Sequence, residues 1–171
     1  MERFWNIIHY FVYLGFYKLH LLTNKVNPVL LLYKTKLFKR RFRKLGIDNP
    51  YNELNYAFKR PDIGICSIFA GGTMGVLTLC LISGISSFYH GVSKTPVKLN
   101  LTTFIIIVVI VLAINYLLIE RNDKYIKYFK EFDKMAGFER KKWKWISIAV
   151  MFGIMLFCIG SFIYMVKMGH K

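Results

Sequence analysis

The run from Ile63 to Tyr89 contains no charged residue. At a rise of 1.5 Å per residue, about 20 apolar residues cross the ~30 Å hydrocarbon core of a bilayer, and this run is longer than that. A helix with so few polar groups has no face that water would solvate well. We therefore predict a membrane-spanning helix over residues 63–89.

Two more apolar runs follow in the chain. Residues 99–119 are rich in Ile and Val, and residues 146–166 begin directly after Trp143 and Trp145. Tryptophan rings favour the boundary between lipid and water, so these two mark the start of a span. The sequence thus predicts an all-α membrane protein with three transmembrane helices.

Residues 1–61 are expected to form aromatic and basic helices in front of the three-span bundle, which covers residues 62–171. The segment 4–17 is apolar and aromatic but short for a span. Its rings favour the headgroup level, so an interfacial or re-entrant helix is the first interpretation. A helix docked against the bundle is the second. A fourth span is the third, and Lys18 and His20 argue against it.

The helical pattern of the second span does not stop at the predicted membrane edge. Charged residues fill the loop 120–144, but apolar residues recur there at i, i+3, i+4 and i+7. We predict one continuous helix from Leu99 to Ala136, about 55 Å long, with ~25 Å of it extending into the cytoplasm. Glu120 and Lys124 would form an i, i+4 ion pair on this extension. The recurring apolar residues are Tyr125, Tyr128, Phe129, Phe132, Met135 and Ala136.

A basic amphipathic helix is predicted over residues 28–45. Asn27 and Pro28 are typical of a helix start, and Gly46 is typical of a helix end. Such helices lie on membranes, where each Lys or Arg near anionic lipid contributes ~1 kcal/mol. Nucleic acid is a less favoured partner, because the aromatic residues lie on the face opposite the charges. The candidate lipid- or partner-binding residues are Lys34, Lys36, Lys39, Arg40, Arg41, Arg43 and Lys44.

The distribution of charge predicts the orientation in the membrane. The formal net charge is +16, and 21 of the 25 Lys and Arg residues lie in segments 1–62 and 120–144. The positive-inside rule therefore places the N-terminus in the cytoplasm and the C-terminus outside. The abundance of Phe, Tyr, Ile, Lys and Asn is typical of AT-rich bacterial genomes, which indicates the cell inner membrane.

Small residues follow one face of the first span. Ser67, Gly71 and Gly75 lie four residues apart, the spacing that lets two helices approach closely in lipid. One possible partner is the third span, where Gly153 and Gly160 share a face. The other is a second copy of the chain, which would make the protein a homo-oligomer.

Polar residues inside the spans have two interpretations. Asn115 is expected to form an interhelical hydrogen bond worth ~0.6–2 kcal/mol, and lining a pore is the alternative. Thr73, Thr78 and Ser83 would belong to the same pore, on the face of the first span.

The sequence contains no set of residues whose types and spacing are typical of a catalytic or cofactor-binding site. His20, His90 and His170 have no partners at metal-ligand spacing, and the three cysteines give no disulfide framework. Arg3 and His9 match a loose Arg-x4–6-His spacing found in some ribonucleases. A surface arginine and an interfacial histidine explain these two residues better, so the prediction is a protein that is not an enzyme.

Three classes of function remain. The first is a non-enzymatic membrane subunit, accessory to or scaffolding an oligomeric bacterial envelope complex, with anionic lipid or other subunits as partners. The second is an oligomeric pore or holin-like effector lined by the first span. The third is an enzyme acting on lipids, which lacks any acid-base pair to support it. A membrane-tethered protein that binds nucleic acid is a further alternative to the membrane subunit.

Overall fold

The computed structural model describes residues 1–33, 35–47, 49–94 and 100–169, and within these ranges all regular structure is helical. Three stretches are long and apolar enough to cross a membrane: Ile65–Ser93, Leu101–Asp133 and Gly137–Met168. The prediction of an all-helical chain with three candidate spans is confirmed. Leu99, the predicted start of the second span, lies outside the described residues.

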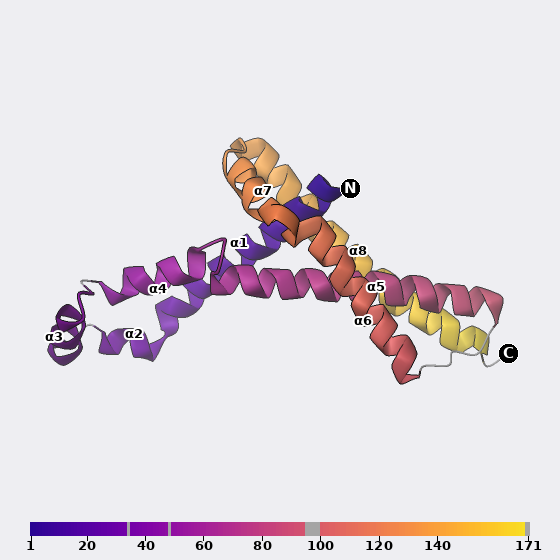
Figure 1. Ribbon diagram of the computed structural model, residues 1–171, viewed down its shortest axis with the longest axis horizontal. Helices are drawn as coiled ribbons and strands as arrows, with labels where there is room; N and C mark the ends of the chain where they lie inside the picture. The colour runs from indigo at the N-terminus through magenta and orange to yellow at the C-terminus, as the bar shows by residue number, and fades with distance from the viewer. Residues whose placement is uncertain (34, 48, 95–99, 170–171) are drawn as a thin grey trace. The chain divides into compact units, whose positions relative to one another are not determined.

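The chain consists of two units. One is Phe11–Gly71, and the other combines Met1–Tyr10 with Gly72–Lys171. Two long helices, α1 (Glu2–Val26) and α5 (Ile65–Ser93), each pass from one unit into the other (Figure 1). The division expected from the sequence, at residue 61, stays a prediction.

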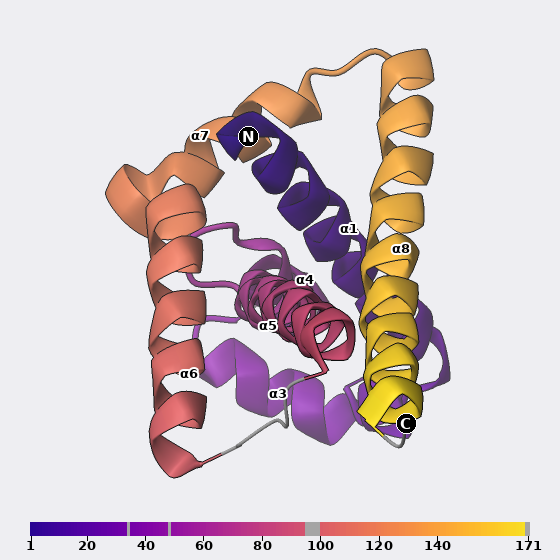
Figure 2. The same cartoon turned by 90° about the vertical axis from the view of Figure 1, so that its right-hand side faces the viewer.

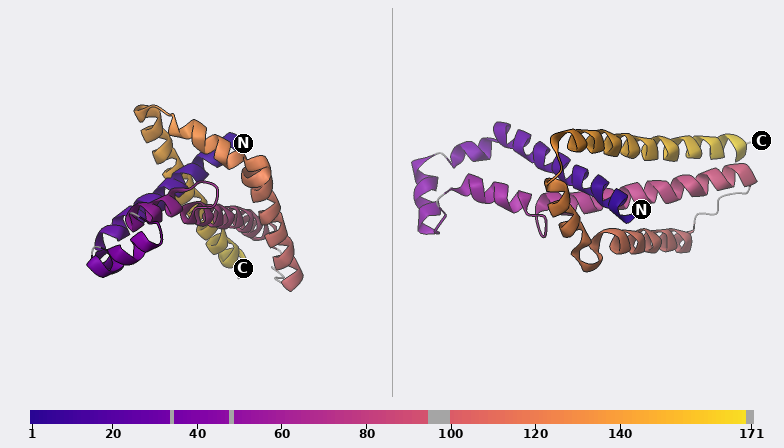
Figure 3. Two further views of the ribbon diagram at one scale, coloured as in Figure 1. Left: turned by 60° about the vertical axis from the view of Figure 1, so that its left-hand side comes forward. Right: turned by 90° about the horizontal axis from the view of Figure 1, so that it is seen from above.

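In the smaller unit, the second half of α1 runs antiparallel to α4 (Pro50–Lys59) (Figure 3). The Tyr13 hydroxyl donates to the Lys59 carbonyl at one end of this pair. Seven residues further along α1, the His20 ring stacks on Phe58 with centroids 3.7 Å apart, and its Nε2 lies 3.1 Å from Asn55 Oδ1. Ring stacking and polar pairing together fix the register of the two helices.

Asn, Pro and Gly set the helix boundaries in this unit, and the helix end predicted at Gly46 is confirmed. Asn49 caps α4, because its side-chain oxygen accepts from the Tyr51 N–H at 3.1 Å while Pro50 occupies the first helical position. Gly46 has φ +75 and ends α3 (Lys36–Lys44). The Ile47 N–H then closes back on the Phe42 carbonyl at 3.0 Å, as expected at a glycine-terminated helix.

The single amphipathic helix predicted over 28–45 is wrong. The chain instead forms a short α2 (Pro28–Leu32) and then α3, which begins after Thr35. Thr35 is extended, and its hydroxyl donates to the Leu32 carbonyl at 2.7 Å. A threonine that bonds its own preceding turn competes with the helical hydrogen-bond ladder, and here it interrupts that ladder.

In the larger unit, α5 meets α8 (Gly137–Gly169) through two glycines that lie seven residues apart. A Cβ at Gly84 would lie 2.9 Å from the Phe157 ring, and one at Gly91 would lie 2.6 Å from the Tyr164 ring. Real Cβ atoms do not approach other atoms so closely. The two helices therefore fit at this distance because both positions lack a side chain.

The continuous cytoplasmic helix predicted from Leu99 to Ala136 is also wrong. Helix α6 (Leu101–Asn115) passes into a π-helical turn (Tyr116–Glu120), and then the chain bends before α7 (Lys124–Asp133). Figure 2 shows the bend. At the bend, Asn122 has φ 60 and Asp123 has φ 53, a left-handed conformation that Asn and Asp tolerate better than most residues.

Residues 2–10 of α1 are docked against α7 and the turn before it. Ile8 and Tyr10 are fully buried. The Asn6 amide donates to the Leu118 carbonyl at 2.8 Å, and the Tyr10 hydroxyl donates to Asp133 at 2.6 Å. Among the three interpretations of segment 4–17, these contacts match the docked helix.

Two ion pairs also join the first turn of α1 to α7. Lys124 pairs with Glu2 at 2.7 Å, and Arg3 pairs with Glu131 at 2.7 Å. The ion pair predicted between Glu120 and Lys124 is therefore wrong, because the left-handed bend separates these residues and Lys124 turns to α1 instead.

Candidate functional site

Helix α3 is the most basic element among the described residues, and none of its residues is buried. It contains no acidic side chain in its sequence, KLFKRRFRK. Leu37 is 80% exposed and Leu45, which follows the helix, is 66% exposed, so cations and apolar side chains both face outward. Lys34 lies outside the described residues. The six other predicted cations are all exposed: Lys36, Lys39, Arg40, Arg41, Arg43 and Lys44.

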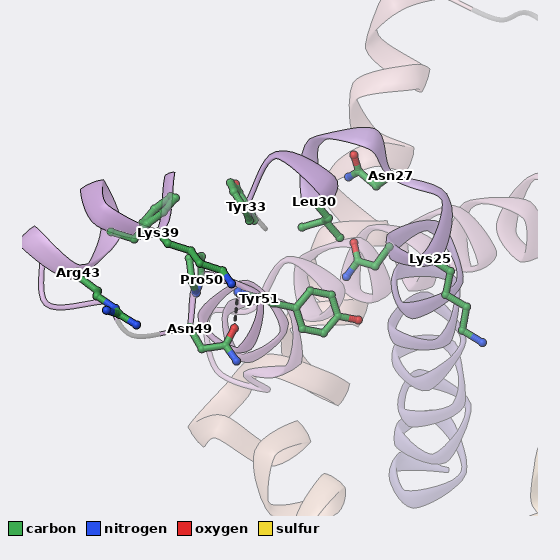
Figure 4. A pocket seen from close by; sticks show the side chains of 11 residues that line it. Lys25, Asn27, Leu30, Tyr33, Lys39, Arg43, Asn49, Pro50 and Tyr51 are labelled. Carbon is green, nitrogen blue, oxygen red and sulfur yellow. Dashed lines mark hydrogen bonds between the residues drawn. The ribbon is translucent and has the colours of Figure 1, made fainter. Parts of the chain in front are cut away.

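One face of α3 borders a hollow, which we call the basic cavity. It measures about 630 Å³ and lies between the end of α1, α2, α3 and the start of α4 (Figure 4). Small-molecule pockets in proteins typically measure ~300–1,000 Å³. The lining residues are Asn24, Lys25, Asn27, Leu30, Tyr33, Lys39, Phe42, Arg43, Asn49, Pro50 and Tyr51.

Two cations of α3 belong to the basic cavity. Lys39 and Arg43 lie four residues apart, so they share one face of the helix. No carboxylate of the described residues lies within 4 Å of either group, so their charge is not neutralised there. Lys25 also borders the cavity, but its ammonium points away from the other lining side chains (Figure 4).

The rest of the cavity wall is apolar or carries neutral amides. The rings of Tyr33 and Phe42 meet edge to face with centroids 5.3 Å apart. Leu30 is 8% exposed and closes the wall behind them. Asn24 and Asn49 also line the cavity, and the buried Asn24 amide is already bonded to His20 and Asn55. Positive charge therefore stands beside an apolar surface, which suits an anion attached to an apolar group.

Two polar residues of the candidate spans, Asn115 and Thr78, are paired with each other. Asn115 donates its side-chain amide to the Thr78 hydroxyl at 3.0 Å and to the Val111 carbonyl at 2.9 Å. The predicted interhelical hydrogen bond of Asn115 is confirmed. Thr73 and Ser83 are half-buried, and their role in a pore stays a prediction.

The pairing of Ser67, Gly71 and Gly75 with the third span stays a prediction. A Cβ built at Gly75, Gly153 or Gly160 meets no described atom within 4 Å, and the same holds for Gly71 in the smaller unit. Ser67 is buried. The close approach of α5 to α8 uses Gly84 and Gly91 instead. Association of the open glycines with a second copy stays a prediction.

No sequence pattern indicated that polar groups of α1 would be buried. His9 is 2% exposed, and neither ring nitrogen has a hydrogen-bond partner among the described atoms. Its ring lies between Tyr125 and Phe129, with centroid distances of 5.8 and 5.1 Å. Burial lowers the pKa of His9 to about 4, so this side chain is neutral near pH 7.

Arg3 and His9 do not converge on a site. Arg3 is exposed and paired with Glu131, whereas His9 is enclosed by aromatic rings. Among the described residues there is also no cluster of three His, Cys, Asp or Glu side chains that could hold a metal ion.

The chain matches no protein-family model, and no curated protein or solved structure is detectably similar to it. A proposal about function must therefore rest on the residues and their geometry.

Proposed function

We propose that this protein is a non-enzymatic membrane subunit, an accessory or scaffold of an oligomeric complex in a bacterial inner membrane. In this proposal α3 lies at the cytoplasmic surface and holds anionic lipid. The observation that carries it is the combination of three candidate spans with a helix whose six described cations and Leu37 are all exposed.

The surface of the candidate spans supports an assembly role. Val111 is the one residue buried in α6, all of whose residues are described. Large apolar side chains such as Phe104 and Leu112 are more than half exposed. Apolar surface of this extent needs lipid or a protein partner. The open glycines of α5 and α8 offer places where a second helix could approach closely.

The orientation in this proposal follows the charge distribution, with both long basic segments inside the cell. Reporter fusions at each terminus test it. A cytoplasmic signal from the N-terminal fusion and an external signal from the C-terminal fusion are expected. Both signals on one side of the membrane would contradict a chain that crosses three times.

The lipid-binding role of α3 is tested with the full-length protein in nanodiscs that either contain or lack phosphatidylglycerol. We expect amide exchange over residues 36–47 to be slower in the anionic discs, and the difference to shrink at high salt because salt screens exposed charges. Equal exchange in both kinds of disc would remove this role.

The subunit role is tested separately by the mass of the protein in detergent. Extraction from its native membrane should give a particle larger than one chain, containing further copies or other subunits. A monodisperse monomer in every mild detergent would contradict it. The pore alternative is weakened because Thr78 and Asn115 already bond to each other, and ohmic current from reconstituted protein would revive it.

A further inference from the structure

The basic cavity differs from the rest of α3 in offering a partly open hollow beside two of the cations. Exposed cations on a helix attract any negatively charged surface, and each one acts almost alone. Lys39 and Arg43 instead lie beside a hollow of about 630 Å³ that also has aromatic and aliphatic walls. This geometry predicts a site for one ligand at a fixed position.

The chemistry of the lining indicates a phosphate group. A guanidinium offers paired N–H donors to two oxygens of one anion, and an ammonium adds a point charge. Asn49 accepts from two backbone N–H groups through its side-chain oxygen, which leaves its amide hydrogens available to a further acceptor. Together these groups present donors, and none of the described residues that line the cavity is acidic, a set that suits a tetrahedral oxyanion.

The apolar wall indicates what carries that phosphate. Tyr33, Phe42 and Leu30 line the same cavity as the two cations. A free phosphate ion would gain nothing from these groups, whereas the glycerol and first methylenes of a phospholipid would bury apolar surface against them.

We propose that the basic cavity binds the phosphate of an anionic phospholipid, with Lys39 and Arg43 as its ligands and Tyr33 and Phe42 against its apolar part. This proposal rests on the lipid-binding role of α3 proposed above, and makes it a specific site rather than a diffuse attraction.

The chain offers a matched control on the same helix. Lys39→Ala with Arg43→Ala removes two charges from the cavity. Arg40→Ala with Lys44→Ala removes two charges with the same spacing, and neither residue lines the cavity. All four side chains are exposed, so neither double variant removes a buried contact.

Native mass spectrometry of the full-length protein, delipidated in a neutral detergent, counts the bound lipids. We expect one phosphatidylglycerol to bind saturably to the unchanged protein and to the R40A/K44A variant. The K39A/R43A variant should bind it at least tenfold more weakly, because two charge-assisted hydrogen bonds are lost. Phosphatidylcholine should bind more weakly than phosphatidylglycerol.

The outcomes separate the two proposals. If both double variants lose affinity equally, α3 acts as a diffuse charged surface, so the cavity site fails while the lipid-binding role stands. If neither variant loses affinity, both proposals fail. Inorganic phosphate at millimolar concentration should displace the lipid only weakly. Tight binding of inorganic phosphate with no preference for lipid would show that the cavity holds a soluble phosphate, contrary to the proposal.

Discussion

Asn115 of α6 donates a hydrogen bond to the hydroxyl of Thr78 in α5 across 3.0 Å, and this pair joins two candidate membrane spans. Every donor hydrogen of the two side chains is used. The Thr78 hydroxyl donates in turn to the Met74 carbonyl at 2.9 Å, and the second amide hydrogen of Asn115 goes to the Val111 carbonyl. In hydrocarbon an unpaired amide is costly, so the pair both stabilises and orients α6 against α5.

A double-mutant cycle measures this link. Asn115→Leu and Thr78→Val should each lower the free energy of unfolding in detergent, and the pair should show a coupling of ~0.6–2 kcal/mol. The double variant should be less destabilised than the sum of the two singles, because each single change strands the other polar group. Strictly additive effects would mean that the two side chains do not interact.

The two glycines facing α8 give a second prediction. Gly84→Leu and Gly91→Leu should each destabilise the bundle by ~1–3 kcal/mol, because the new side chain meets Phe157 or Tyr164 inside normal contact distance. Thermal unfolding in detergent measures the loss. Variants that unfold at the same temperature as the unchanged protein would contradict the close approach of α5 and α8.

Gly153→Leu and Gly160→Leu are the matched controls, because no described atom lies within 4 Å of a Cβ at either position. Their stability should be unchanged or slightly higher, since Leu favours a helix by up to ~1 kcal/mol over Gly. Their mass in detergent is also informative. If a second copy packs on these glycines, the larger side chain should lower the oligomeric mass while the fold persists.

The docking of α1 depends on the Tyr10 hydroxyl. It donates to Asp133 at 2.6 Å and accepts from Arg140 at 2.6 Å. Burial, aided by the Asp133 carboxylate, raises the pKa of Tyr10, so the hydroxyl keeps its proton. Tyr10→Phe should cost ~1–3 kcal/mol and speed amide exchange over residues 2–10.

Tyr17→Phe is the control for this prediction. Tyr17 lies on the same helix but is only half-buried, so loss of its hydroxyl should change stability by less than ~0.5 kcal/mol. Equal exchange over residues 2–10 in both variants would show that the contacts to Asp133 and Arg140 do not hold α1 in place.

The sequence could predict the features that depend on local chemistry. A charge-free run such as 63–89 has few stable environments outside a bilayer, and Asn49 and Gly46 act on their own neighbouring backbone. Asn115 was predictable because a lone amide in an apolar helix must find a partner. Each of these features is decided either by interactions within one helix or by the apolar surroundings of the bilayer.

Features that depend on distant partners were missed. The apolar spacing of residues 125–136 is the same whether α7 continues α6 or turns back, and only the conformation of Asn122 and Asp123 decides between them. Likewise, nothing local distinguishes Gly84, which touches α8, from Gly75, which does not. The aromatic rings that pack against His9 belong to α7, more than 100 residues further along the chain.

The buried imidazole of His9 makes the stability of the protein depend on pH. Its pKa is about 4 in the folded chain and about 6.5 in an unfolded one. The unfolded state therefore binds the proton first, and stability should fall as pH drops from about 6.5 to about 4, by up to ~3 kcal/mol in total. Above pH 6.5 both states are neutral, and this contribution is constant.

His9→Leu isolates this effect from all other titrating groups. The variant should be as stable as the unchanged protein at pH 7.5, or more stable, because both nitrogens of His9 are buried without a partner among the described atoms. The stability of the variant relative to the unchanged protein should then increase as the pH falls toward 5. Unfolding in detergent, measured at several pH values for both proteins, gives this difference directly. A stability difference between the two proteins that stays constant between pH 7.5 and 5 would show that His9 reaches water in the folded protein. The first turns of α1 would then not pack on α7 as tightly as the ring contacts with Tyr125 and Phe129 require.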